Sequence, residues 1–248
     1  MIHLTLPPVM NRHPTSIIIQ AVAIPFIIIG CVTVPLTMDG QSEAVQYAAM
    51  LPLAYLLGSI SWGYMLLQWK MGVDVREYGS GRTGMSNVLR TGGVKAAAAV
   101  LTLDIAKGVI AVVIARAVIG TTAAEVSAAL IVLVGHNWPV FLQFKGGRGI
   151  LTALGGLAIM APLPAILATA TFLAVTALSR YISLGSVIGV MIGAIAVLVL
   201  ALADVHSDTY MVYGFIACGM IIWQHRDNLQ RIREGRERRI GQQATRVD

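Results

Sequence analysis

The chain has 248 residues, of which 56% are hydrophobic and only 12% are charged. Its mean hydropathy of +0.76 excludes an ordinary soluble globular protein, in which about a quarter of the residues are charged. A formal net charge of +6 would suit a nucleic-acid-binding protein, but the basic residues flank apolar runs, where membrane orientation and anionic partners explain them better. We therefore predict an integral membrane protein with no nucleic-acid partner.

Seven apolar runs follow one another along the chain, and most approach the ~20 residues that a membrane-spanning helix requires. They cover residues 15–37, 44–69, 96–119, 126–144, 150–178, 184–203 and 210–223. The fifth run is too long for one comfortable span, and Pro162 and Pro164 interrupt its middle. Because proline removes a backbone donor and clashes with the preceding helical turn, we predict two helices joined near residues 161–164.

The distribution of charge supports a count of eight apolar segments. With a hairpin in the fifth run, nearly every Lys and Arg lies on one side of the membrane, and Arg116 is the clear exception. The other side carries the acidic residues Asp39, Glu43, Glu125, Asp204 and Asp208. By the positive-inside tendency, the basic side is cytoplasmic. We predict an all-α fold, a polytopic membrane helical bundle with seven core transmembrane helices plus an extra N-terminal helix, multi-pass in the inner (plasma) membrane.

The first apolar run stands apart from the rest of the bundle. One basic residue, Arg12, precedes it, so a spanning helix or an uncleaved signal anchor is expected. Residues 28–31 only poorly resemble a lipoprotein cleavage box, and no A-x-A-like site follows. Cleavage, and a true start at Met38 or Met50, stay open as alternatives. We divide the chain into an N-terminal extension (1–44), a membrane domain (45–240) and a disordered cytoplasmic tail (241–248).

Three polar clusters interrupt the apolar pattern, each at the edge of an apolar run. Their sequences are GSGRTGMSNVLR (79–90), GHNWPVFLQFKGGRG (135–149) and HRDNLQRIREGRE (225–237). Each is rich in groups that bind phosphate, namely glycine backbone N–H groups and the side chains of Arg, Lys, Asn and Ser. The predicted topology places all three on the cytoplasmic side. We therefore expect them to form one anion site beside the lipid.

The first cluster has the composition of an anion nest. Its glycines at 79, 81 and 84 allow close backbone approach and positive φ angles. Its side-chain donors are Ser80, Ser86, Asn87 and Arg90. A flexible, solvated loop with incidental basic residues is the alternative interpretation, and the presence of the second cluster weakens it.

The second cluster ends in Lys145-Gly146-Gly147-Arg148-Gly149, where cations alternate with glycines directly before an apolar run. If a helix starts at Ile150, its N-terminal N–H groups and dipole add to Lys145 and Arg148 as a phosphate receptor. The chain contains no GxxxxGK[ST] pattern, so a Walker loop and ATP hydrolysis are not expected. His136, earlier in the cluster, either touches substrate or caps a helix.

The third cluster adds a polar helical face near the membrane exit. His225 and Asn228 are three residues apart and share that face, while the arginines of 231–239 suit a stop-transfer and lipid-headgroup segment. Inside the third apolar run, Asp104 and Lys107 are also three residues apart. They either act at the site or neutralise each other and hold helices together. The two cysteines have no partner spacing, and we expect no disulfide, metal ion or cofactor.

In order and spacing, the three clusters resemble the bacterial acyl-phosphate:glycerol-3-phosphate acyltransferase family, the PlsY-type integral membrane acyltransferases. That family has a Gly-Ser-Gly-rich loop ending in Asn-x-x-Arg, a Gly-His to Phe-Lys-Gly-Gly-Lys-Gly loop, and a terminal His-Arg-x-Asn to Gly-x-Glu motif. The resemblance covers residues from about 51 to 240. The chain departs from it at Arg82, where the family usually has Asn, at Met85-Ser86, where it has Ala-Thr, and at Arg148, where it has Lys.

The resemblance implies that a fatty acyl phosphate and glycerol 3-phosphate react to give 1-acylglycerol 3-phosphate (lysophosphatidate) and phosphate in phospholipid synthesis. An acyl phosphate carries a good leaving group, so the protein mainly positions two anions and stabilises developing charge. The 1-hydroxyl of glycerol 3-phosphate is the nucleophile. A substrate phosphate takes its proton, and His225 is the best candidate base in the protein. We expect a monomer whose partners are these substrates, membrane lipids and the acyl-phosphate-forming enzyme.

By the same resemblance, the catalytic residues are Ser80, Lys145, His225 and Asn228. The substrate-binding residues are Gly81, Arg82, Gly84, Ser86, Asn87, Arg90, Gly146, Gly147, Arg148, Gly149 and Ser183. Lys145 is expected to neutralise the phosphate that the glycine loop cradles. A catalytically weakened paralogue that binds lipid phosphates, and a transporter of phosphorylated metabolites, remain alternatives. Acyltransferases that use a His-x-x-x-x-Asp motif are excluded, because none of the five histidines has Asp five positions later.

Overall fold

The computed structural model describes residues 15–246 and confirms the all-α fold. Arg12, which precedes the first apolar run, lies outside the described residues, as do the last two residues of the expected tail. The helices are α1 (Thr15–Thr37), α2 (Glu43–Ser59), α3 (Trp62–Met71), α4 (Met85–Val118), α5 (Thr122–Asn137), α6 (Ile150–Met160), α7 (Pro162–Ser179), α8 (Ile182–Leu202), α9 (Thr209–Gln224) and α10 (Arg226–Arg233). Two short 3-10 turns, η1 (Val75–Glu77) and η2 (Val140–Leu142), lie in the loops.

Six segments of the described chain are long and apolar enough to cross a membrane. They are Thr15–Thr37, Glu43–Met71, Met85–Val118, Thr122–Leu142, Pro162–Ser179 and Ile182–Leu202. The helices α6 and α9 are apolar but shorter. The break expected at residues 161–164 is confirmed, because α6 ends at Met160 and α7 begins at Pro162. The number of spans, eight in the sequence interpretation, stays a prediction.

One run that reads as continuous in the sequence is broken in the structure. Residues 44–69 divide into α2 and α3, and Ile60 and Ser61 between them have non-helical backbone angles. No proline marks this position. Instead, the buried Lys107 Nζ donates hydrogen bonds to the carbonyl oxygens of Gly58 and Ile60, each at 3.1 Å. A helix end in an apolar layer needs such partners, and the lysine supplies them.

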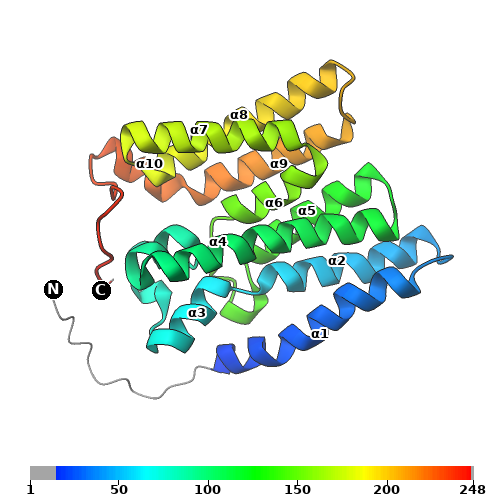
Figure 1. The fold of residues 1–248 in the computed structure, drawn as a ribbon, viewed down its shortest axis with the longest axis horizontal. Coiled ribbons are helices and arrows are strands. Elements are labelled where there is room, and N and C mark those ends of the chain that lie inside the picture. The colour runs from blue at the N-terminus through cyan, green and yellow to red at the C-terminus, as the bar shows by residue number, and fades with distance from the viewer. Residues whose placement is uncertain (1–14, 247–248) are drawn as a thin grey trace.

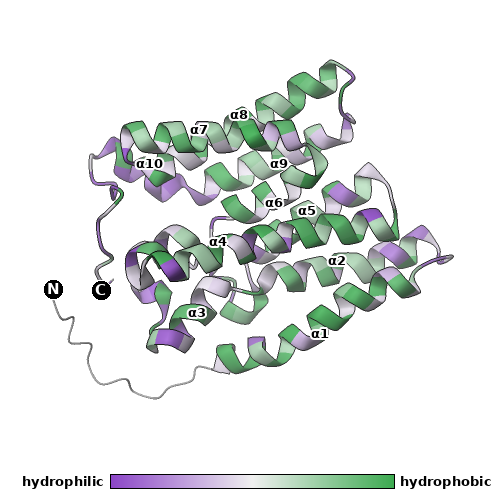
Figure 2. Cartoon of the chain, viewed as in Figure 1, coloured by the Kyte–Doolittle hydropathy of each residue, from purple (hydrophilic) through white to green (hydrophobic). Residues whose placement is uncertain are grey.

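The helices run side by side, so the loops gather at two ends of the bundle (Figure 1). One end carries α10, α3, the start of α4 and most of the hydrophilic residues (Figure 2), and all three polar clusters lie there. The other end carries the α1–α2, α4–α5 and α8–α9 loops. Arg116, the exception in the charge pattern, lies near that end, and its Nε forms an ion pair of 2.7 Å with Glu125. The ion pair with Glu125 therefore compensates the positive charge of Arg116 at the acidic end of the bundle.

The tail segment folds back onto the first polar cluster. The backbone N–H of Gly79 donates to the carbonyl oxygen of Thr245 at 2.8 Å, and that of Ala244 donates to Arg90 at 3.3 Å. Arg246 also forms an ion pair of 3.1 Å with Glu77. The sequence interpretation gives residues 241–248 as a disordered tail; within this segment, the structure places residues 244–246 against the start of α4 and the loop that precedes it.

Candidate active site

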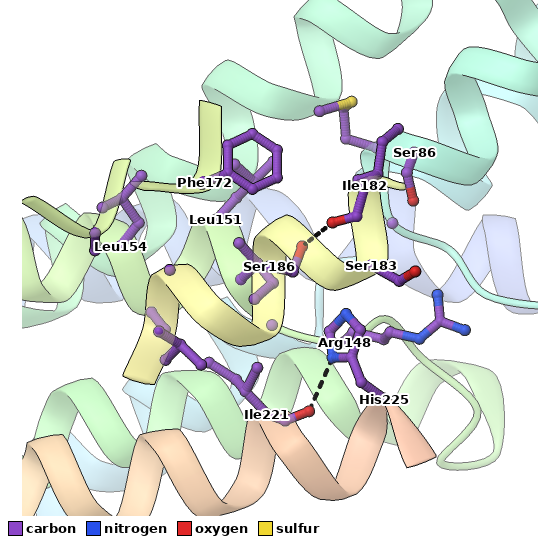
Figure 3. Close-up of a pocket in the computed structure, with 18 of the residues that line it drawn as sticks. Ser86, Arg148, Leu151, Leu154, Phe172, Ile182, Ser183, Ser186, Ile221 and His225 are labelled. Atoms are coloured by element: carbon purple, nitrogen blue, oxygen red, sulfur yellow. Dashed lines mark hydrogen bonds between the residues drawn. The ribbon is translucent and has the colours of Figure 1, made fainter. Parts of the chain in front are cut away.

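One cavity of about 360 Å³ joins the three polar clusters. Its polar end lies among the loops before α4, α6 and α8 and the start of α10, and Figure 3 shows Ser86, Arg148, Ser183 and His225 converging there. The rest of the cavity extends between α4, α6, α7, α8 and α9. That part is lined by apolar side chains such as Leu101, Leu154, Leu157, Phe172 and Val190. The cavity thus combines a polar mouth with a chamber for an apolar chain.

Most of the residues predicted for the site line this cavity, although 148 positions separate the first from the last. They are Ser80, Arg82, Gly84, Ser86, Asn87, Arg90, Arg148, Gly149, Ser183, His225 and Asn228. Four predicted residues do not line it: Gly81, Lys145, Gly146 and Gly147. The convergence of the three clusters, expected from their topology, is therefore present in the fold.

Three arginines make the mouth of the cavity strongly cationic. Arg82, Arg90 and Arg148 all line it, and within residues 15–246 none of them forms an ion pair with a carboxylate. Burial lowers the pKa of Arg148, and the positive charge of Arg82 nearby lowers it further. Burial likewise lowers the pKa of Arg82. Asp227 and Glu237 lie near enough to offset part of this charge. Three cations without a direct ion pair still favour an anionic ligand, and guanidinium groups match the geometry of phosphate.

The glycine-rich loop before α6 is built differently from the phosphate cradle that the sequence predicts. Lys145 is exposed, and its backbone N–H donates to Leu142 at 3.1 Å. The N–H groups of Gly146 and Gly147 donate to the carbonyl oxygens of Asn137 and His136, at 3.3 and 3.1 Å. Three of the expected anion donors are therefore already used: two tie the loop to the end of α5, and that of Lys145 bonds to the 3-10 turn η2.

The two glycines are required for packing. A Cβ atom on Gly147 would lie 2.1 Å from Nε2 of His136, so only glycine fits there. What remains for an anion is the terminal nitrogens of Arg148, whose Nε donates to the carbonyl oxygen of Gln224 at 3.1 Å, and the first N–H groups of α6, which have no intrahelical partners. Gly149, Ile150 and Leu151 at this helix start line the cavity. Of the two cations predicted for phosphate binding in this loop, Arg148 lines the cavity and Lys145 does not.

In the first cluster, Asn87 shapes the loop. Its Oδ1 accepts a hydrogen bond from the Ser80 backbone N–H at 3.1 Å. Its Nδ2 lies 2.9 Å from each of three carbonyl oxygens, those of Val75, Tyr78 and Arg82. With its amide fully engaged, Asn87 positions its neighbours instead of donating to a ligand. The Oγ atom of Ser80, by contrast, is buried and has no partner among the described residues.

His225 enters the cavity in a defined tautomer. Its Nδ1 lies 2.8 Å from the carbonyl oxygen of Ile221, drawn as a dashed line in Figure 3. Since a carbonyl can only accept, Nδ1 carries the proton and Nε2 keeps its lone pair. Burial, followed by the charge of Arg148, lowers the pKa of His225 to about 4. The imidazole is therefore neutral at physiological pH and presents an acceptor.

This lowered pKa predicts a pH-dependent stability. Between pH 6.5 and 4 the unfolded chain binds a proton at His225 that the folded protein does not, so stability falls as the pH falls through this window. The loss is at most about 1.4 kcal/mol per pH unit. Melting temperatures in detergent at pH 6.5 and 5.0 are expected to differ more for the native protein than for His225→Gln. Equal differences would show that another group carries the effect.

Glu237 is the site residue that sequence reasoning missed. Its carboxylate accepts hydrogen bonds from Ser183 Oγ at 2.8 Å, Asn228 Nδ2 at 2.6 Å and Arg231 Nε at 2.9 Å. Burial alone would raise the pKa of Glu237, but these hydrogen bonds bring it below its ordinary value. Asn228 is left with an Oδ1 that is buried and unpartnered in residues 15–246. The sequence offers one indication of this role, because Glu237 is the last residue of the third polar cluster.

Asp104 and Lys107 form the ion pair that their spacing indicates, at 3.0 Å. Lys107 also holds the α2–α3 break, while Asp104 Oδ1 lies 3.6 Å from Nδ1 of His136. That nitrogen is 3.2 Å from Thr152 Oγ1 on α6. Asp104 and His136 line the cavity, but every one of these groups has a protein partner. These contacts favour a structural role for Asp104 and His136 over direct contact with a substrate.

Comparisons with known proteins agree with the motif analysis. A family model described as glycerol-3-phosphate acyltransferase matches residues 48–235. The chain is 43% identical over 205 residues to glycerol-3-phosphate acyltransferase 3 of Dehalococcoides mccartyi, covering 77% of this chain and 94% of the relative. It is 42% identical over 206 residues to the glycerol-3-phosphate acyltransferase of Synechococcus elongatus, covering 80% and 96%.

Two solved structures are similar in fold as well as in sequence. Both are of PlsY (YgiH), described as an integral membrane glycerol 3-phosphate acyltransferase. The glycerol 3-phosphate form has a TM-score of 0.72 and 35% identity, and the lysophosphatidic acid form has a TM-score of 0.69 and 33% identity. Each comparison covers 77% of this chain and 94% of the solved one.

Proposed function

This chain belongs to the glycerol-3-phosphate acyltransferase family, and we propose that it moves a fatty acyl group from acyl phosphate to the 1-hydroxyl of glycerol 3-phosphate. The products are 1-acylglycerol 3-phosphate and inorganic phosphate. The observation that carries the proposal is the cavity, in which three arginines that form no ion pair within residues 15–246 lead directly into an apolar chamber. Such a site suits a molecule that joins a phosphate to a long acyl chain.

The polar groups left free at the mouth suit the acceptor. Glycerol 3-phosphate brings one phosphate and two hydroxyl groups. The cavity offers cations for the phosphate, and two acceptors for hydroxyl hydrogens, Nε2 of His225 and Oδ1 of Asn228. The solved relatives are described as a glycerol 3-phosphate form and a lysophosphatidic acid form, which supports the same acceptor and product here.

The reaction then needs positioning and charge stabilisation. The oxygen of the 1-hydroxyl bonds to the acyl carbonyl carbon, and the bond from that carbon to the phosphate oxygen breaks. Negative charge grows first on the carbonyl oxygen and then on the departing phosphate. Arg148, the N–H groups at the start of α6 and the hydroxyl of Ser80 are the donors we assign to this charge. Arg82 and Arg90 hold the second phosphate.

The hydroxyl proton goes to the departing phosphate. His225, with a pKa of about 4, is too weak a base to keep that proton, although its Nε2 can orient the hydroxyl. The two carboxylates that line the cavity are already engaged, Asp104 with Lys107 and Glu237 with its three donors. Phosphate, whose second pKa lies near neutrality, is the strongest available acceptor, so no acyl-enzyme and no dedicated protein base are needed.

The donor preference tests the proposal directly. Purified protein in detergent, supplied with labelled glycerol 3-phosphate, is expected to form lysophosphatidate from palmitoyl phosphate in the presence of EDTA. Acyl-CoA is expected to substitute poorly, because the cavity has no His-x-x-x-x-Asp pair to assist thiol release. Robust turnover with acyl-CoA or acyl carrier protein and none with acyl phosphate would overturn the donor assignment.

The orientation and partners follow from the same chemistry. Glycerol 3-phosphate is a water-soluble anion, and most of the hydrophilic residues gather at the end of the bundle that carries the cavity mouth (Figure 2). The positive-inside tendency supports a multi-pass protein of the plasma membrane whose site faces the cytoplasm. We propose that it acts as a monomer and receives acyl phosphate from the enzyme that forms it. Labelling of single cysteines placed beside Lys145 and Asp204 in right-side-out vesicles distinguishes the two orientations.

Arg82 distinguishes an active enzyme from a weakened paralogue. Its guanidinium lines the cavity beside Arg148 and forms no direct ion pair in the described chain, although Asp227 acts on it electrostatically, which is the arrangement of a ligand-binding cation. We expect Arg82→Asn to raise the KM for glycerol 3-phosphate about tenfold, the size of one lost charge-assisted hydrogen bond. Steady-state kinetics with labelled substrate measures this. A large gain in activity would instead identify a paralogue that Arg82 has weakened.

A further inference from the structure

The first helix contacts the rest of the bundle through a buried polar side chain. Gln20 on α1 is fully buried, and its Oε1 accepts a hydrogen bond of 2.9 Å from the backbone N–H of Ser61. Its Nε2 donates to the carbonyl oxygen of Ser16 at 3.3 Å. The family match begins at residue 48, after this helix has ended. Residues outside the shared domain therefore satisfy a backbone donor within it.

Ser61 belongs to the break between α2 and α3 that supports the active site. On the other side of this break, Lys107 donates to the carbonyl oxygens of Gly58 and Ile60. Lys107 pairs with Asp104, which lies beside His136. The ring of His136 in turn packs against Gly147, the residue before Arg148. A continuous set of contacts thus leads from α1 to the loop that carries Arg148.

A second contact leads from α1 to the other anion-binding loop. Ser16 Oγ is hydrogen-bonded to the hydroxyl of Tyr64 on α3 at 2.7 Å. The guanidinium of Arg76 stacks 5.1 Å from the centre of the same ring. Arg76 lies in η1, and the neighbouring Val75 carbonyl accepts one of the hydrogen bonds of Asn87. This second route ends at the loop that presents Ser80.

We propose that α1 is a resident part of the enzyme and that Gln20 is a positioning residue, which fixes the α2–α3 break and thereby the two anion-binding loops. A signal sequence that is removed would not contribute a side-chain amide, here that of Gln20, to the hydrogen bonding of the remaining protein. An unsatisfied backbone N–H is costly in an apolar layer, so the contact between Gln20 and Ser61 favours the docked state. The kinetic consequence of this proposal rests on the proposed function, whereas the docking itself does not.

The test uses four single substitutions in the full-length protein, purified in detergent. Gln20→Met keeps the size and loses the acceptor. Gln20→Glu keeps an acceptor oxygen for Ser61 and, when protonated, a donor for Ser16. Ser16→Ala removes only the hydroxyl contact with Tyr64, so it stays informative if the Met variant does not fold. Thr33→Val is the matched control, because Thr33 is an exposed residue on the same helix.

We expect the intact mass of the native protein to include α1. Hydrogen exchange at Ser61 should be slow in the native protein, accelerate in Gln20→Met and slow again in Gln20→Glu. The KM for glycerol 3-phosphate should rise about tenfold in Gln20→Met, within the range of positioning effects, and about threefold in Ser16→Ala. It should recover in Gln20→Glu and be unchanged in Thr33→Val.

Three results would overturn the proposal. The first is a purified protein that lacks α1, and the second is a hydrogen-exchange rate at Ser61 that does not change when Gln20 is substituted. The third is a set of variants with lower yield but the native KM, since a merely structural role lowers only the amount of active enzyme. Mass and exchange need no turnover. An inactive native protein with a protected Ser61 would therefore count against the proposed reaction and leave the docking of α1 standing.

Discussion

Arg148→Gln is expected to lower kcat/KM by about 10²- to 10³-fold, the usual consequence of removing one preorganised donor from a developing charge. Arg148 is the one cation of the glycine-rich loop that lines the cavity, and the backbone donors of Lys145 to Gly147 are already bonded to other carbonyls. Glutamine keeps part of the length and one donor but removes the charge. The measurement is steady-state formation of labelled lysophosphatidate at matched protein concentrations.

Lys145 provides the matched control in the same loop. Its side chain is exposed and does not line the cavity, so Lys145→Gln is expected to change kcat/KM by less than about threefold, the effect of an exposed charge. The two variants should also unfold at similar temperatures. If Lys145→Gln abolishes turnover while Arg148→Gln retains it, the loop rearranges around the substrate and the assignment made from the sequence is right.

Gly147→Ala is expected to reduce activity by about 100-fold, because a small displacement of a catalytic loop has that effect on rate. The added Cβ would lie 2.1 Å from His136 Nε2, a distance that real atoms do not adopt, so either the loop or the histidine must move. Both are held, the loop by its bonds to residues 136 and 137 and the histidine by Thr152 and Asp104. Kinetic assays and a thermal unfolding curve together measure the effect.

Gly219→Ala is the control for this substitution. Gly219 is a helical residue of α9 with open space around the position of an added Cβ. Alanine there is expected to be neutral or to stabilise the helix by up to about 1 kcal/mol. Equal activity in the two variants would mean that the loop before α6 has room that the packing does not show.

The fold was predictable largely because membrane proteins have few choices. A chain with long apolar runs must form helices, since every backbone donor in lipid needs an internal partner. Proline then located the break between α6 and α7. The break between α2 and α3 has no such marker, because it depends on Lys107 and Gln20, which are distant in sequence and reach it through tertiary contacts. No local pattern contains that information.

The site was predictable as a set of clusters but not as individual roles. Order and spacing identified the three segments, and the structure brings ten of their predicted residues, together with Ser183, to one cavity. The sequence did not indicate which backbone N–H groups remain free, because those of Gly146 and Gly147 donate to carbonyl oxygens at the end of a different helix. The same holds for Asn87 and Glu237. An amide or a carboxylate in a motif can bind substrate or position its neighbours, and only its hydrogen-bond partners in the structure distinguish the two roles.

The packing of residues 244–246 against the loop that precedes α4 also bears on how the protein is made. Three parts of the site, His225, Asn228 and Glu237, and the backbone that pairs with Gly79 are synthesised after the helices that form the apolar chamber. Chains emerge from the ribosome in order, and their early parts fold first. The chamber and the three arginines of its mouth can therefore enter the bilayer before the last polar groups of the site are made. We therefore expect chains that end before Glu237 to be inactive in acyl transfer.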